Sequence, residues 1–201
     1  MSDCDVVIVD SGGANLASLR FALDRLGARS AVSADAAQIA AAPRVLLPGV
    51  GAAADAMARL AAHRLSDTLR QLRQPLLGIC LGMQLLYEYS EEGDTPGLGL
   101  LPGRVRRIAA APGRPVPHMG WNTCSPLRAD ALLTGLAGSD YYYFVHSYAA
   151  PVTDATSASV DYGEAMSAVV QRGNLHGVQF HPERSGPAGA RLLRNFLALP
   201  A

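Results

Sequence analysis

A cysteine with a glycine two residues away on each side is the feature that most constrains this chain. Residues 78–82 read Gly-Ile-Cys-Leu-Gly, after the apolar residues 75–77 and before residues 83–87, whose composition is that of a helix. A strand, a sharp turn that carries a nucleophile and a helix together make a nucleophile elbow. Its turn is strained and crowded, and glycine tolerates both conditions because it has no Cβ. The sequence therefore predicts that Cys80 lies on such an elbow.

The expected helix after Cys80 gives the sulfur a favourable electrostatic position. Its first N–H groups and the positive end of its dipole would point at the sulfur and favour the thiolate. The alternative is a structural cysteine in an α/β core, since cysteine is among the most buried residue types. The elbow alone leaves the two interpretations open.

A second segment, residues 175–186, favours the catalytic interpretation. It begins as an apolar, alternating strand, and Pro182 ends that strand with His181 at its last position. A cysteine nucleophile needs a base, and the base needs a carboxylate that orients it. His181 and Glu183 supply both groups, although His-Pro-Glu by itself is more often a loop with a solvated glutamate. Together with the elbow, the segment predicts a catalytic triad of Cys80, His181 and Glu183.

The length, composition and charge of the chain limit the class of protein to which it can belong. The 201 residues suit one domain, 1–201, and the content of 49% hydrophobic and 17% charged residues is that of a soluble globular protein. Lys plus Arg equal Asp plus Glu at 17 each, so the charge gives no reason to expect nucleic acid or a membrane surface as a partner. No apolar run is long enough to span a bilayer, and the first residues are acidic, unlike a signal peptide. Three cysteines form no disulfide framework, so we expect a cytoplasmic protein.

Strand-like and helix-like segments alternate in the first half of the chain. They are a buried strand at 6–9, a helix at 16–26, a strand at 45–47 and a long amphipathic helix at 57–72, before the elbow. Later come a loop at 91–103, strands at 105–108 and 141–146, a hairpin of 168–171 with 175–180, and a helix at 187–199. The pattern predicts an α/β fold: a mostly parallel central sheet with helices on both faces, plus added antiparallel strands.

The sequence gives no indication of a metal or a cofactor. No pair of cysteines or histidines has the spacing of zinc ligands. Residues 49–51 read Gly-Val-Gly but lack the third glycine of a dinucleotide fingerprint. We therefore expect neither a metal site nor a bound nucleotide cofactor.

The elbow and the His-Pro-Glu segment together resemble the class I glutamine amidotransferases, which implies a flavodoxin-like fold. Within that family, five segments are similar to the glutaminase subunits of imidazole glycerol phosphate synthase: 48–51, 78–84, 116–122, 143–148 and 177–186. The segments occur in the order of those subunits and nearly span the chain. Residues 118–122, His-Met-Gly-Trp-Asn, narrow the resemblance most.

The resemblance implies that Cys80 attacks the side-chain amide of glutamine and that His181, held by Glu183, protonates the departing ammonia. Hydrolysis of a glutamyl thioester then gives glutamate. An oxyanion needs two preorganised donors. The resemblance assigns one to the N–H of Leu81 and the other to the loop at Val50 and Gly51, where a peptide flips. The implied glutamine-binding residues are Gly51, Gln84, Glu92, Ser147 and Tyr148, with a solvated loop carboxylate as the alternative for Glu92.

The resemblance also implies a partner, a separate (β/α)₈-barrel cyclase that receives the ammonia. The joint products are imidazole glycerol phosphate and an aminoimidazole carboxamide ribotide, in histidine biosynthesis. The residues that match the partner face are Asn15, Met119, Trp121, Tyr143 and Arg184. For Trp121 the alternative is a core or rim residue. Arg184 stands where that family usually has lysine, and residues 11–14, Ser-Gly-Gly-Ala, stand where it commonly has Tyr-Gly-x-Gly.

Three other functions stay open at this point. One is an amidotransferase subunit for another acceptor, in anthranilate, aminodeoxychorismate or pyridoxal phosphate synthesis. It would share the first chemical step and differ around Trp121. The second is a stand-alone cysteine hydrolase, and the third is an inactive binding scaffold on the same fold, which the presence of all three triad residue types disfavours.

Overall fold

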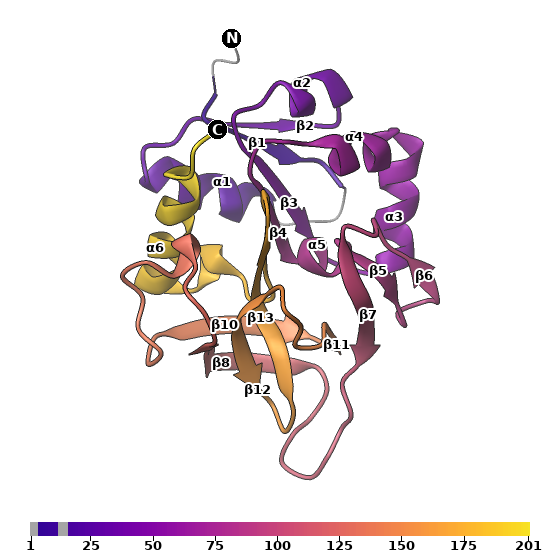
Figure 1. Ribbon diagram of the computed structural model, residues 1–201, viewed down its shortest axis with the longest axis vertical. Coiled ribbons are helices and arrows are strands. Elements are labelled where there is room, and N and C mark those ends of the chain that lie inside the picture. The colour runs from indigo at the N-terminus through magenta and orange to yellow at the C-terminus, as the bar shows by residue number, and fades with distance from the viewer. Residues whose placement is uncertain (1–3, 12–15) are drawn as a thin grey trace.

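A mixed β-sheet with helices on both faces organises the computed structural model, which describes residues 4–11 and 16–201 (Figure 1). Within those residues an eight-stranded sheet has the order β2-β1-β3-β4-β14-β13-β12-β9. Its parallel part comprises β2 (Ser30–Ser33), β1 (Val6–Val9), β3 (Val45–Gly49), β4 (Leu76–Cys80) and β14 (Leu175–Val178). Its antiparallel part comprises β13 (Ala165–Arg172), β12 (Thr156–Asp161) and β9 (Ser125–Pro126). The predicted fold class is confirmed.

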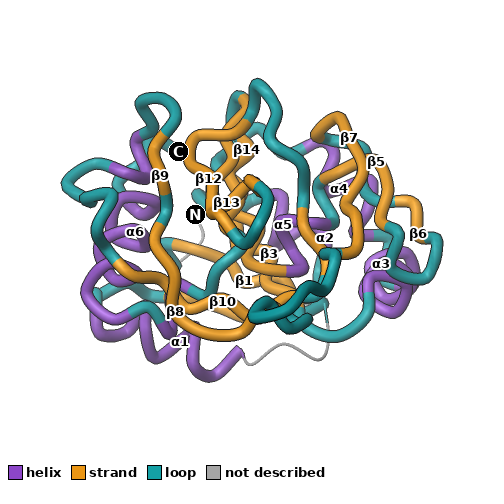
Figure 2. The backbone as a smooth tube through the Cα atoms, turned by 90° about the horizontal axis from the view of Figure 1, so that it is seen from below, coloured by secondary structure: helices purple, strands orange, loops and turns teal. Residues whose placement is uncertain are grey.

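Two layers of helices cover the sheet, one on each face (Figure 2). One layer is α1 (Leu16–Arg25) with α6 (Gly186–Leu197), and the other is α2 (Ala36–Ala40), α3 (Ala53–Ala62) and α4 (Leu65–Gln71). The side chains of β1 alternate between the two cores, because successive residues of a strand point to opposite faces. Val6 and Ile8 pack in the core of α1 and α6, while Val7 and Val9 pack in the core of α2, α3 and α4. Burial on both faces explains the continuous apolar run.

Two smaller sheets stand beside the central one. The first pairs β10 (Tyr141–His146) with β8 (His118–Thr123), and the second has the order β11 (Tyr148–Ala149), β7 (Leu101–Arg107), β5 (Tyr87–Ser90) and β6 (Thr95–Pro96). Short helical turns complete the fold: α5 (Leu81–Gln84), η1 (Ala131–Leu133) and η2 (Pro182–Arg184). The N–H of His181 donates to the carbonyl of Tyr143 over 2.9 Å, which joins β10 to the carboxyl end of β14.

The prediction of one long helix over 57–72 is wrong. The segment forms two helices, α3 and α4, which meet at Arg64 with a left-handed φ of 55°. Leu60 and Leu65 are both buried in the same core, and their spacing explains the break. On one continuous helix, five residues would separate them by about 140° around the axis. A turn between the helices lets both side chains enter the core.

Other boundaries also differ from the prediction. The helix expected over 83–87 is α5, which ends at Gln84, and Tyr87 is instead the buried first residue of β5. Part of the expected loop at 91–103 forms β6 and the start of β7. Strand β12 was not predicted, because its sequence, Thr-Ser-Ala-Ser-Val-Asp, lacks the usual alternation of apolar and polar residues. One of its buried hydroxyl groups is satisfied across the sheet, because Thr156 Oγ1 lies 2.7 Å from Ser167 Oγ.

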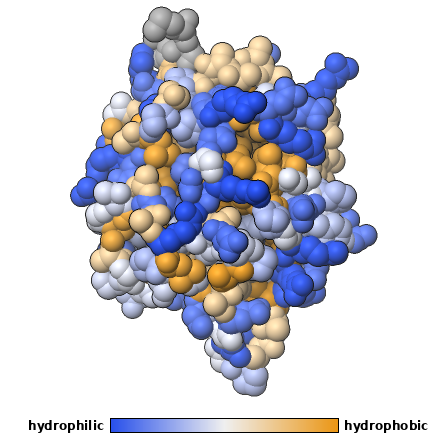
Figure 3. Space-filling view, viewed as in Figure 1, coloured by the Kyte–Doolittle hydropathy of each residue, from blue (hydrophilic) through white to orange (hydrophobic). Residues whose placement is uncertain are grey.

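On the face seen in Figure 3, hydrophobic side chains lie in scattered groups among hydrophilic ones. Exposed large apolar side chains on the two-stranded sheet include Met119, Trp121 and Tyr141. Among the helices of the described segments, none has the length and apolar character needed to cross a membrane.

Candidate active site

Cys80 occupies a strained turn between β4 and α5. It is the last residue of β4, and α5 begins at Leu81. Its φ of 53° is positive, a conformation that is uncommon for a residue other than glycine. Strained backbone of this kind clusters at functional sites. The strand, strained turn and helix have the arrangement of the predicted elbow.

The glycines on either side of Cys80 are required for a close approach of the backbone. A Cβ on Gly82 would lie 1.7 Å from the carbonyl oxygen of Leu47, and one on Gly78 would lie 2.7 Å from the backbone of Gly82 and Met83. Neither glycine is among the residues with positive φ, so the strained conformation belongs to Cys80 itself. The predicted crowding is confirmed, whereas the prediction of unusual dihedrals at the glycines is wrong.

His181 and Glu183 form a hydrogen-bonded pair beside Cys80. The distance from His181 Nδ1 to Glu183 Oε1 is 2.9 Å, and the two side chains are 10% and 9% exposed. The buried hydroxyl of Ser185 donates to the carbonyl of His181 over 2.7 Å and accepts from the N–H of Tyr143 over 3.0 Å. These contacts hold the backbone of His181 between β10 and the start of α6.

The pKa of His181 reflects three neighbouring influences. Burial lowers it, but Cys80 and Glu183 raise it more, and the pKa of His181 is raised to about 10. A carboxylate beside an imidazole favours the imidazolium, and so does a thiolate. His181 is therefore in its protonated form near neutral pH, placed between two groups that can carry negative charge.

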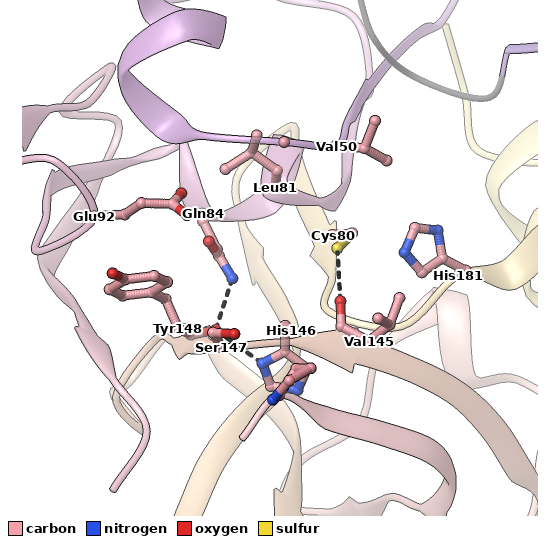
Figure 4. A pocket seen from close by; sticks show the side chains of 12 residues that line it. Val50, Cys80, Leu81, Gln84, Glu92, Val145, His146, Ser147, Tyr148 and His181 are labelled. Carbon is pink, nitrogen blue, oxygen red and sulfur yellow. Dashed lines mark hydrogen bonds between the residues drawn. The ribbon is translucent and has the colours of Figure 1, made fainter. Parts of the chain in front are cut away.

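A cavity of about 310 Å³ opens in front of Cys80. Figure 4 shows Gln84, Glu92 and Tyr148 to one side of Cys80 and His181 to the other. The cavity is lined by Val50, Gly51, Cys80, Leu81, Gln84, Glu92, Pro117, Val145, His146, Ser147, Tyr148 and His181. The structure thus brings the predicted oxyanion and glutamine-binding residues to one cavity, with Glu183 behind His181.

Two polar side chains of the cavity are held by further hydrogen bonds. Oε2 of Glu92 accepts from the N–H of Ala53 over 2.8 Å, at the first residue of α3. Nε2 of Gln84 donates to the carbonyl of Tyr148 over 2.8 Å and to Oε1 of Gln179 over 2.9 Å. Glu92 is therefore half-buried and bonded to a helix start, which excludes a purely solvated carboxylate.

The residues predicted for a partner face lie mainly on the two-stranded sheet. The rings of Trp121 and Tyr143 meet edge to face with centroids 5.9 Å apart, and the guanidinium of Arg184 lies 5.4 Å from the Tyr143 ring. Trp121 is 56% exposed, so it is not a core residue, and Met119, two residues earlier on β8, is 66% exposed. Asn15 lies outside the described residues.

Three buried polar residues near the site were not predicted. Gln179 is fully buried and its Nε2 lies 3.8 Å from the sulfur of Cys80. His146 lines the cavity, and its Nε2 lies 3.1 Å from Nδ1 of the buried His118. A polar residue within an apolar strand was the available signal for Gln179, since buried polar groups need hydrogen-bond partners.

Within residues 4–11 and 16–201, no group of three or more His, Cys, Asp or Glu side chains is arranged to hold a metal ion.

We expect a thiol reagent to label Cys80 and to spare Cys124. Cys124 is 4% exposed, and burial raises the pKa of its thiol to about 12, so almost no thiolate forms below pH 9. Mass spectrometry of tryptic peptides after brief treatment with iodoacetamide measures both sites. Protection of Cys80 by glutamine is the control, and labelling of Cys124 ahead of Cys80 would contradict the choice of nucleophile.

Solved structures with the same fold include two glutamine amidotransferases. A structure described as a glutamine amidotransferase superposes with a TM-score of 0.75 at 21% identity, over 96% of this chain and 96% of that one. A glutamine amidotransferase from Thermotoga maritima has a TM-score of 0.64 at 14% identity, over 95% of this chain and 81% of that one. At these identities the likeness concerns the fold alone.

Sequence comparisons place the chain in a family. The model of the family "Glutamine amidotransferase class-I" matches residues 7–199. The imidazole glycerol phosphate synthase subunit HisH of Xanthomonas axonopodis pv. citri is 57% identical over 195 residues, 97% of this chain and 98% of that protein. HisH of Xylella fastidiosa strain Temecula1 is 56% identical over 197 residues, 98% of each chain. The chain therefore belongs to the class I glutamine amidotransferase family, within the group of HisH subunits.

Proposed function

We propose that the chain hydrolyses glutamine to glutamate and ammonia with a triad of Cys80, His181 and Glu183. The observation that carries the proposal is the 2.9 Å contact of His181 Nδ1 with Glu183 Oε1, beside a strained Cys80 on the same cavity. Membership of the class I glutamine amidotransferase family supports the choice of glutamine as substrate. The proposal treats residues 1–201 as one domain and includes the cytoplasmic location expected from the cysteine content.

The chemistry follows from the protonation state of the pair. The Cys80 thiolate attacks the side-chain carbonyl carbon of glutamine, and the imidazolium of His181 donates its proton to the nitrogen that leaves as ammonia. The resulting glutamyl thioester is attacked by a water molecule, which His181 deprotonates. His181 keeps the proton that it takes from the water, and the carbon–sulfur bond breaks to release glutamate and the Cys80 thiolate. The starting pair of thiolate and imidazolium is thereby restored. Glu183 orients the imidazole and stabilises its positive charge throughout.

Two N–H groups are proposed for the oxyanion. Leu81 is the first residue of α5, and the first N–H groups of a helix have no partner within the helix. The second donor comes from the loop that carries Val50 and Gly51, where Gly51 has a φ of +88°. Both ends of this loop are anchored, by Ser11 Oγ on the Pro48 carbonyl over 2.9 Å and by Glu92 on the N–H of Ala53. Anchored ends confine a peptide flip to the residues between them.

The remaining polar groups of the cavity suit the amino-acid end of glutamine. Nε2 of Gln84 is engaged with Tyr148 and Gln179, which leaves its oxygen to accept from the substrate. The negative charge of Glu92 suits the substrate ammonium group. The carbonyl of Tyr148 already accepts two hydrogen bonds, from Gln84 and from His146 Nδ1 at 2.8 Å. The N–H groups of residues 147–148 are the donors that we assign to the substrate carboxylate.

The ammonia is proposed to pass to a barrel cyclase, the other subunit of imidazole glycerol phosphate synthase. The HisH relatives support this partner by their name, and the products would be imidazole glycerol phosphate and aminoimidazole carboxamide ribotide, in histidine biosynthesis. A second cavity of about 130 Å³ shares Val50, Val145 and His181 with the first and extends to Arg184. It supports departure of ammonia toward the surface formed by Trp121, Tyr143 and Arg184.

We expect the isolated chain to release glutamate slowly and the cyclase with its nucleotide ligand to accelerate it about 100-fold. The reason is that hydrolysis without an acceptor wastes ammonia, and a loop with two states lets the partner favour the active one. The measurement is glutamate release by the chain alone, with the cyclase, and with the cyclase plus ligand. Synthase subunits for anthranilate, aminodeoxychorismate and pyridoxal phosphate are the comparison partners.

Equal rates in all samples would contradict the coupling and favour a stand-alone hydrolase. Activation by one of the comparison partners in place of the cyclase would assign the chain to that acceptor. An absence of glutamate in every sample would favour the inactive scaffold.

A further inference from the structure

Gln179 lies at the back of the elbow, next to the sulfur of Cys80. It directly follows β14, the strand that pairs in parallel with β4, and it is fully buried. Its Nε2 lies 3.8 Å from Cys80 Sγ, and its Oε1 accepts from Nε2 of Gln84 over 2.9 Å. Both ends of the carboxamide are therefore engaged, one by a side chain of the cavity and one by the nucleophile.

The carbonyl of Tyr148 decides which way the two carboxamides point. A carbonyl oxygen can only accept, so Gln84 must turn its NH₂ group toward Tyr148, at 2.8 Å. The same NH₂ group meets Gln179, which must therefore present its oxygen to Gln84. The remaining end of Gln179, its NH₂ group, then faces the sulfur. The orientation of each amide thus follows from the network and ends with an N–H donor on Cys80.

Two buried histidines support the same carbonyl from the other side. Nδ1 of His146 donates to the carbonyl of Tyr148 over 2.8 Å, so Nε2 of His146 accepts from Nδ1 of His118 at 3.1 Å. Burial lowers the pKa of His146 to about 4, which keeps this ring neutral and able to accept. The carbonyl of Tyr148 consequently accepts two hydrogen bonds, one from Gln84 and one from His146.

Besides its interaction with His181, the sulfur of Cys80 has two polar contacts that favour opposite protonation states. As a thiol it donates to the carbonyl of Val145 over 3.8 Å, a contact that favours the protonated form. The N–H of Gln179 can donate to the sulfur in either form, and a hydrogen bond to an anion is the stronger one. The geometry points to Gln179 as the donor that stabilises the Cys80 thiolate, with Gln84 and the Tyr148 carbonyl orienting its amide. This role rests on the glutaminase function proposed above.

Substitution of Gln179 by methionine tests this role. Gln179→Met keeps an unbranched side chain and removes the donor, and we expect alkylation of Cys80 by iodoacetamide at pH 7 to slow about tenfold, the range for a hydrogen bond to a charged group. The pH at which alkylation reaches half its maximal rate should rise. The matched control is Gln171→Met, since the Gln171 amide bonds to the Gly173 carbonyl and to Arg128, away from the site. Its alkylation profile should equal that of the unsubstituted chain.

An unchanged alkylation profile in a folded Gln179→Met chain would overturn the role. Gln179→Glu is the second variant, because it keeps the acceptor for Gln84 and places an oxygen on the sulfur, so alkylation should slow further. A measurement on the unsubstituted chain covers the case in which neither variant folds. The side-chain amide resonances of Gln179 should shift across the pH range of alkylation and should not shift in Cys80→Ala; constant resonances in both would reject the contact.

The alkylation assay requires neither glutamine nor a partner. A normal profile in Gln179→Met would therefore reject the role of Gln179 and leave the proposed glutaminase function intact. A slowed profile in Gln179→Met, combined with an absence of glutamate release by the unsubstituted chain with every partner, would reject the glutaminase function alone.

Discussion

Replacement of Cys80 by alanine should reduce glutamine hydrolysis by about four orders of magnitude or more, the range found when a triad member is removed. The sulfur is the only proposed group that forms a covalent bond to the substrate, so no other side chain can replace it. The fold should survive, because the change removes a single atom and alanine meets the same backbone requirement as cysteine at a φ of 53°. Glutamate release in the presence of the cyclase and its ligand measures the effect.

Ammonium salts provide the control for this variant. With the cyclase present, Cys80→Ala should still support synthesis from added ammonium, since the proposed function places the second reaction in the cyclase. The matched variant is Cys124→Ala, which changes a buried cysteine outside the site and should keep glutaminase activity. Full glutaminase activity in Cys80→Ala would reject the mechanism.

Replacement of His181 by alanine should have a similarly large effect and should exceed that of Glu183→Gln. In the proposed mechanism His181 moves the proton in both half-reactions, whereas Glu183 orients the ring and stabilises its charge. Glutamate release by the two variants, each with the cyclase and ligand, gives the comparison. A smaller loss in His181→Ala than in Glu183→Gln would show that the roles are assigned wrongly.

The titration of His181 gives an independent measure of the same pair. Because Cys80 and Glu183 hold the pKa of His181 at about 10, the imidazole should stay protonated on raising the pH from 7 to 9. In Glu183→Gln one of the two negative neighbours is lost, so the pKa should fall toward the ordinary value of about 6.5 and the ring should lose its proton at lower pH. The ¹⁵N chemical shifts of the imidazole report the change. An unaltered titration curve in Glu183→Gln would contradict the electrostatic contribution of that carboxylate.

The local patterns of the sequence were sufficient to predict the fold class and to single out Cys80, His181 and Glu183, whereas the other predicted residues of the cavity came from the family resemblance. The apolar run at 6–9, the β-rich residues 141–146 and the hairpin around 172–174 appear as β1, β10 and the β13–β14 pair. The sequence also indicated the elbow, because a turn with crowded backbone requires glycines at fixed spacing. These features depend on neighbours within a few residues, so their physical causes are present in the sequence itself.

The tertiary structure alone decided the features that depend on which strands are neighbours. The pairing of β4 with β14 places Gln179 behind Cys80, and the pairing of β8 with β10 places Trp121 against Tyr143, next to Arg184. The division of 57–72 into α3 and α4 likewise follows from the shared core that both must reach. Each contact joins residues far apart in the chain or on different elements. Local sequence fixes the type of each element, but only the packing of the whole chain fixes which side chains meet.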